Sequence, residues 1–147
     1  SMVGFLVLIF VTMLGTALIT TLYKYKAGRA SIHSVIYMTG IVCSILLLCI
    51  PIFLKIMFGE ILFFQSDTGK MVGVIHIGAV LFIASYPAHR YNKYLNSETT
   101  SAMLEKNQIP AFNRIAIDRL SWIWIPGVLL MVVGIIMLIQ HLWEVII

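Results

Sequence analysis

The chain has 147 residues, of which 61% are hydrophobic and only 11% are charged. A soluble domain of this length carries about twice that charged fraction, so the composition excludes an ordinary water-soluble protein and favours a single domain of membrane-spanning helices. The net charge of +4 does not indicate a nucleic-acid partner, because the basic residues flank apolar segments, where membrane orientation explains them.

The first apolar segment predicts a membrane-spanning helix over about residues 2–22. Within it, Thr12, Thr16 and Thr20 recur at every fourth position and therefore form one polar line on the helix, here called the threonine stripe. Gly15 lies beside it. Such a face suits close packing, with hydroxyls bonding to a neighbouring helix or to carbonyls of the same helix. We expect a packing surface, and a substrate path is the alternative.

The second and third spans are expected over about residues 33–58 and 71–89. Pro51 lies inside the second span and predicts a kink near its far end. The apolar segment from Ile61 to Phe64, between the two spans, is too short to cross a bilayer. We expect it to lie at the membrane surface.

The polar residues 90–119 predict a cytoplasmic loop, in which Pro110 marks the start of a helix that approaches the membrane. The fourth span is expected over about residues 120–146. Trp122 and Trp143 bracket this span and lie about 31 Å apart at 1.5 Å per residue, close to the thickness of the hydrocarbon core. These aromatic residues are typical anchors at the two membrane surfaces.

The Lys and Arg residues set the expected orientation. The first and third connections contain Lys24, Lys26, Arg29, Arg90, Lys93, Lys106, Arg114 and Arg119, and the middle connection contains Lys55 and Lys70. This bias places the first and third connections in the cytoplasm and both termini outside. The connections favour an all-α fold of four transmembrane helices in an antiparallel up-down bundle. Gly127 and Gly134, on one face of the last helix, predict close contact with a helix of this chain or of a second subunit.

His76 and His141 are the candidate ligands for a bound group. Each lies about 9 Å inside the outer end of its predicted helix, so both are expected at one depth. Imidazoles on facing helices suit a b-type haem or a soft metal, and the sulfurs of Cys49 and Met71 suit Cu(I). We expect no cofactor, with haem b or copper as the alternatives, and a polar contact between the two histidines. No metalloprotease, CxxC, phosphate-loop or triad pattern occurs, so no catalytic residue is predicted.

The segment FLVLIFVTMLGTALITTLY, residues 5–23, resembles the first helix of a family of small bacterial four-helix membrane proteins of unassigned function. That family is distantly similar to copper resistance protein D. The likeness resumes at residues 109–112 and continues through Arg114, Trp122, Pro126, Met131 and Val132. The resemblance implies a four-helix architecture. Members of the wider group often carry a histidine in the first helix, and the matching position here is Thr12, so that ligand is missing.

These features favour a multi-pass protein of the bacterial inner membrane that acts as a non-catalytic accessory factor, scaffold or subunit. The spans contain almost no charge that could couple to ions or protons. Its expected partners are the lipid bilayer and either a second copy or another membrane protein. One alternative is a haem- or copper-binding protein that uses His76 and His141. A second is a small transporter or lipid-handling protein that uses the threonine stripe.

Overall fold

The computed structural model describes residues 2–59 and 66–147, and every regular element in these residues is an α-helix. The helices are α1 (Met2–Lys26), α2 (Ile32–Phe58), α3 (Asp67–Leu95), α4 (Thr100–Gln108), α5 (Ala111–Leu120) and α6 (Trp124–Ile146). Four stretches are long and apolar enough to cross a membrane, namely α1, α2, α3, and α5 with α6 together. The all-helical class and the four apolar spans are therefore confirmed. The segment from Ile61 to Phe64 lies outside the described residues.

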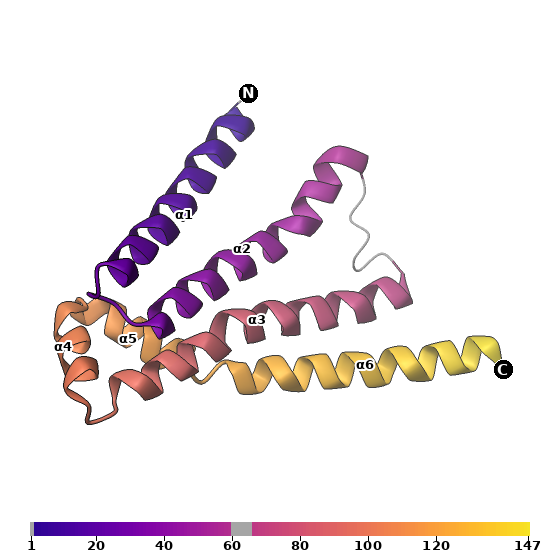
Figure 1. Ribbon diagram of the computed structural model, residues 1–147. Helices are drawn as coiled ribbons and strands as arrows, with labels where there is room; N and C mark the ends of the chain where they lie inside the picture. The colour runs from indigo at the N-terminus through magenta and orange to yellow at the C-terminus, as the bar shows by residue number, and fades with distance from the viewer. Residues whose placement is uncertain (1, 60–65) are drawn as a thin grey trace.

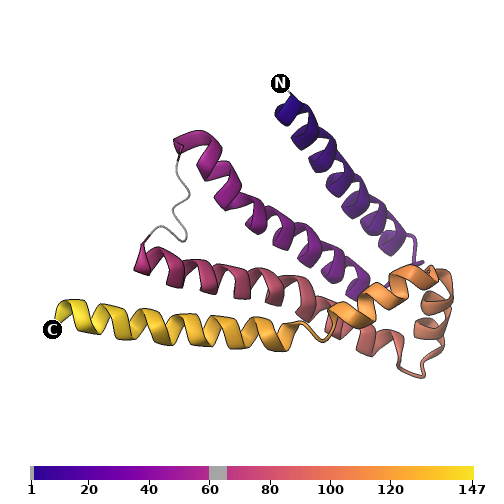
Figure 2. The same cartoon turned by 180° about the vertical axis from the view of Figure 1, so that it is seen from behind.

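The four long helices α1, α2, α3 and α6 lie in a row in that order, and neighbours in the row run in opposite directions (Figures 1 and 2). The row is narrow where the α1–α2 turn, α4 and α5 gather, and we call this the narrow end. Toward the two chain termini α1 and α2 spread away from each other and from α3, whereas α6 stays beside α3. Helix α3 packs on α2 and on α6, whereas α1 packs on α2 at the edge of the row.

The region predicted as a loop over residues 90–119 is mostly helical. Helix α3 continues to Leu95, and α4 and α5 fill most of the remainder. The fourth span was expected to start near residue 120, and its long helix α6 begins at Trp124, after a turn at residues 121–123 that separates it from α5. Pro110 does begin a helix, as predicted, since it occupies the N-cap position of α5. The segment predicted as a loop is therefore folded mostly into helices, and these form part of the narrow end.

The third span is longer than the predicted 71–89 at both ends. Its helix begins at Asp67, because the Ser66 side chain accepts a hydrogen bond from the Gly69 amide at 3.0 Å and so caps the first turn. At the other end, the helix continues because Tyr91 and Leu95 are buried in the small core of the narrow end. Helix α3 thus continues past both ends of the apolar segment, through residues that are mostly polar.

Glycines allow α6 to approach α3 closely. A Cβ atom on Gly127 would lie 2.9 Å from the Phe82 nitrogen, and one on Gly134 would lie 2.6 Å from Ile75 Cγ1. Both glycines are buried. The contact line expected on this face of the last helix therefore runs along a helix of the same chain.

A small hydrophobic core lies at the narrow end. Its buried apolar residues are Tyr91, Leu95 and Ile117, with Tyr37, Tyr94 and Ile109 packed against them. These side chains come from α2, α3, α5 and the α4–α5 connection. Because four elements meet there, the narrow end fixes the relative positions of side chains that are far apart in the sequence.

Candidate functional site

The two histidines proposed as ligands point to different surroundings. Nε2 of His76 donates a hydrogen bond to the Leu47 carbonyl oxygen of α2 at 2.8 Å. His141 instead lines a cavity of about 220 Å³ with Asp67, Lys70, Met71, Val74 and Met137, a set that does not include His76. The structure thus brings Met71 to His141 and directs His76 toward α2.

A metal-ligand cluster is absent from the part of the chain that the structure describes. No group of three or more His, Cys, Asp or Glu side chains gathers there closely enough to hold an ion. Cys49 is a half-buried free thiol on α2. Copper or haem binding by this chain therefore stays a prediction from the sequence.

The threonine stripe faces outward. Thr12, Thr16 and Thr20 are exposed, and nothing lies within 4 Å of a Cβ atom built on Gly15. Thr12 donates to the Leu8 carbonyl and Thr20 to the Thr16 carbonyl, both at 2.7 Å. The hydroxyls of Thr12 and Thr20 are thus bonded within α1, and the packing surface expected on this face has no partner helix within the described chain.

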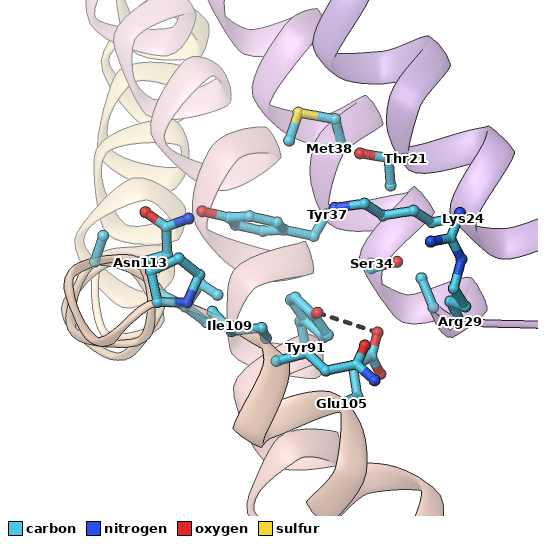
Figure 3. A pocket seen from close by; sticks show the side chains of 15 residues that line it. Thr21, Lys24, Arg29, Ser34, Tyr37, Met38, Tyr91, Glu105, Ile109 and Asn113 are labelled. Carbon is cyan, nitrogen blue, oxygen red and sulfur yellow. Dashed lines mark hydrogen bonds between the residues drawn. The ribbon is translucent and has the colours of Figure 1, made fainter.

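A cavity of about 400 Å³ with a largely polar lining lies at the narrow end (Figure 3). Its walls come from the end of α1, the α1–α2 turn, the start of α2, the end of α3, α4 and the start of α5. The lining residues with polar side chains are Thr21, Lys24, Arg29, Ser34, Tyr37, Tyr91, Glu105, Gln108 and Asn113. We call this the narrow-end cavity.

Glu105 lines this cavity and is only 7% exposed. One carboxylate oxygen, Oε1, accepts from the Ser31 amide at 2.9 Å, from the Ser31 hydroxyl at 3.2 Å and from the Tyr91 hydroxyl at 3.2 Å. These bonds tie α4 to the α1–α2 turn and to α3. Glu105 therefore holds together three segments that are distant in sequence.

The second carboxylate oxygen of Glu105 has no donor. Oε2 is buried, and no hydrogen-bond donor among the described residues reaches it. A buried polar atom without a partner costs about 1–3 kcal/mol, and more when it carries charge. Native structures seldom leave such an atom unpaired, so an unpaired carboxylate oxygen in a cavity wall marks a place where a ligand could donate.

Two cations line the same cavity. Lys24 lies in the last turn of α1, and Arg29 follows in the α1–α2 turn, with its guanidinium carbon 5.6 Å from the centre of the Tyr23 ring. In Figure 3 the Glu105 side chain reaches from α4 toward the side of the cavity that carries Ser34, Lys24 and Arg29. The residues that line the cavity thus include one buried carboxylate with an unpaired oxygen and two exposed cations.

Sequence reasoning did not single out Glu105, because it lies in a stretch that reads as a solvated loop. The available signal was the spacing of Ala102 and Glu105, which puts both residues on one side of α4, where both are buried. A glutamate on the inward side of a short helix is a candidate for a buried contact, but its partner Ser31 is 74 residues away in the sequence. Only the folded chain identifies that partner.

No protein-family model, curated protein or solved structure matches this chain.

Proposed function

We propose that this chain is a multi-pass protein of the bacterial inner membrane that works without catalysis of its own, as a scaffold, accessory factor or subunit. In this proposal the four spans belong to an antiparallel bundle, with both termini outside and the narrow end in the cytoplasm. Eight of the ten Lys and Arg residues lie in residues 24–29 and 90–119, which form the ends of α1 and α3, the α1–α2 turn, α4 and α5, and this supports the orientation.

The proposal rests on the exposed face of α1 that carries the threonine stripe. No residue of α1 is buried. The helix packs on α2, and its half-buried side chains Leu14, Leu18 and Thr21 share one side. The threonine stripe lies on the other side, about 150° away at 100° per residue. Small and hydroxyl-bearing side chains are those that membrane helices use for close packing, so we assign this face to a helix of another chain, with a second copy as the first candidate.

Cross-linking in native membranes tests this assignment. In a chain carrying Cys43→Ala and Cys49→Ala, we expect Thr16→Cys to form a disulfide-linked pair of chains under mild oxidation, because the stripe would lie at the interface. Leu14→Cys is the matched control, since Leu14 is half-buried and lies on the side of α1 opposite the stripe. It is expected to stay monomeric.

The contrary result is equally clear. If Thr16→Cys stayed monomeric and the detergent-solubilised protein copurified with no other membrane protein, the role as a scaffold or subunit would be wrong.

A further inference from the structure

The unpaired Oε2 atom of Glu105 calls for a donor that the described residues do not supply. The Ser31 and Tyr91 groups that reach Glu105 all donate to Oε1. Neither Lys24 nor Arg29 donates to Oε2, although both line the cavity. The acceptor is a carboxylate oxygen, so the donor that suits it best is an N–H group with a positive charge.

At the α1–α2 side of the cavity the lining residues include cations, which need an anionic acceptor. Lys24 and Arg29 face the cavity there, and Arg29 lies against the Tyr23 ring and forms no hydrogen bond with Glu105. Arginine and lysine together are typical ligands for a phosphate group. The cavity therefore matches a molecule that carries an ammonium group at one end and an anionic group a short distance away.

The position of the cavity indicates where such a molecule comes from. Its walls include Thr21 and Lys24 near the end of α1, Ser34 and Tyr37 near the start of α2, and Tyr91 near the end of α3. These are the ends of three candidate spans, and lipid headgroups lie at the depth where spans end. Its volume of about 400 Å³ is in the range of ligand pockets, roughly 300–1,000 Å³.

We propose that the narrow-end cavity binds the headgroup of a phospholipid that carries a primary ammonium group, such as phosphatidylethanolamine. The ammonium group donates to Oε2 of Glu105, and Lys24 and Arg29 hold the phosphate. The proposal requires the chain to lie in a membrane but does not require α1 to pack on another chain. A monomeric protein that bound this lipid would contradict the assembly role and leave the lipid site intact.

Lipid binding to the full-length protein tests the proposal. Delipidated protein in detergent is titrated, with detection by native mass spectrometry, with phosphatidylethanolamine, phosphatidylcholine and phosphatidylglycerol of identical acyl chains. Phosphatidylcholine keeps the charges of phosphatidylethanolamine but has no N–H donor, and phosphatidylglycerol keeps only the phosphate. We expect phosphatidylethanolamine to bind about tenfold more tightly than either, because only it can donate to Oε2. Equal binding of the three lipids would overturn the proposal.

Matched variants locate the site. Glu105→Gln replaces Oε2 by an amide nitrogen or leaves a neutral acceptor, so the preference for phosphatidylethanolamine over phosphatidylcholine should disappear. Glu98→Gln removes an exposed carboxylate that does not line the cavity and should keep the preference. A preference that survived Glu105→Gln would refute the role of this residue.

A second pair of variants keeps the test valid if Glu105→Gln fails to fold. Lys24 and Arg29 are exposed, so Lys24→Gln with Arg29→Gln should fold and should weaken phosphatidylethanolamine binding about tenfold, whereas Lys26→Gln should not. Unchanged binding in the double variant would contradict the phosphate site. Soluble phosphoethanolamine is the last arm: if it bound as tightly as the lipid, the source would be a free molecule and the assignment to lipid would be wrong.

Discussion

Glycines mark the closest approaches between the long helices. A Cβ atom on Gly40 of α2 would lie 2.7 Å from the Ile83 carbonyl oxygen of α3. One on Gly78 of α3 would lie 2.8 Å from both the Gly127 carbonyl oxygen and the Met131 nitrogen of α6. Lipid supplies no hydrophobic drive for helices to associate, so the van der Waals contact that these glycines permit is a main source of packing energy. Helix α3 thus makes close glycine contacts with α2 on one side and with α6 on the other.

Gly78→Ala should therefore destabilise the protein. The new methyl group meets two backbone atoms, which cannot rotate away, so α3 and α6 must separate. We expect a loss of about 1–3 kcal/mol, seen as a lower unfolding temperature in detergent.

Gly15→Ala is the matched control for this substitution, because nothing lies within 4 Å of the added atom. Alanine is the better helix former by about 1 kcal/mol, so this variant should be as stable as the parent chain or more stable. Equal destabilisation by both substitutions would show that the contact between α3 and α6 is looser than described.

At the scale of elements, α4 is the shortest of the described helices and the one that positions Glu105. An isolated helix shorter than about 12 residues is marginal in water, so α4 (Thr100–Gln108) depends on its ends and its contacts. The Thr99 side chain accepts a hydrogen bond from the Ala102 amide at 3.3 Å, which satisfies one free donor of the first turn. The carboxylate of Glu105 then ties the helix to the α1–α2 turn.

Removal of this cap should loosen α4 selectively. Thr99→Ala is expected to cost about 1 kcal/mol locally, which corresponds to roughly fivefold faster hydrogen exchange of the α4 amides. The measurement is hydrogen–deuterium exchange followed by mass spectrometry, peptide by peptide.

The neighbouring exposed residue gives the control, since the hydroxyl that Thr100→Ala removes forms no hydrogen bond with the described residues. It should leave the exchange of α4 unchanged. Uniform acceleration over α3 and α6 in the Thr99 variant would mean that the cap supports the whole molecule rather than α4 alone.

At the scale of the whole molecule, the two ends of the helix row differ in charge. The narrow end contains the connections rich in Lys and Arg, and the opposite end carries both termini (Figure 1). Positive charge near the ends of spans favours the cytoplasmic side. The orientation proposed for the chain follows from this distribution of charge.

Labelling from one side of the membrane tests the orientation. In a background with Cys43→Ala and Cys49→Ala, Thr68→Cys and Asn107→Cys introduce thiols at exposed positions on opposite ends of the molecule. A membrane-impermeant maleimide added to intact cells should modify Thr68→Cys, because the start of α3 is expected outside. It should modify Asn107→Cys only after permeabilisation. The reverse pattern would invert the orientation and place the narrow-end cavity in the other leaflet.

The sequence by itself determined the helical class and the number of apolar spans. Both follow from local properties, since a bilayer requires about 20 consecutive apolar residues and satisfied backbone hydrogen bonds within each span. The positions of Gly127 and Gly134 on one face of the last helix also followed from spacing alone, because helical periodicity is fixed. The helix that starts after Pro110 was predicted for the same local reason.

Only the tertiary structure decided which elements meet. It assigned Gly127 and Gly134 to α3, directed His76 toward Leu47, and left the threonine stripe on the outside. It also joined Glu105 to Ser31 across 74 residues of sequence. Such contacts depend on the packing of side chains from distant segments, and no local pattern encodes which of several apolar helices will become the neighbour.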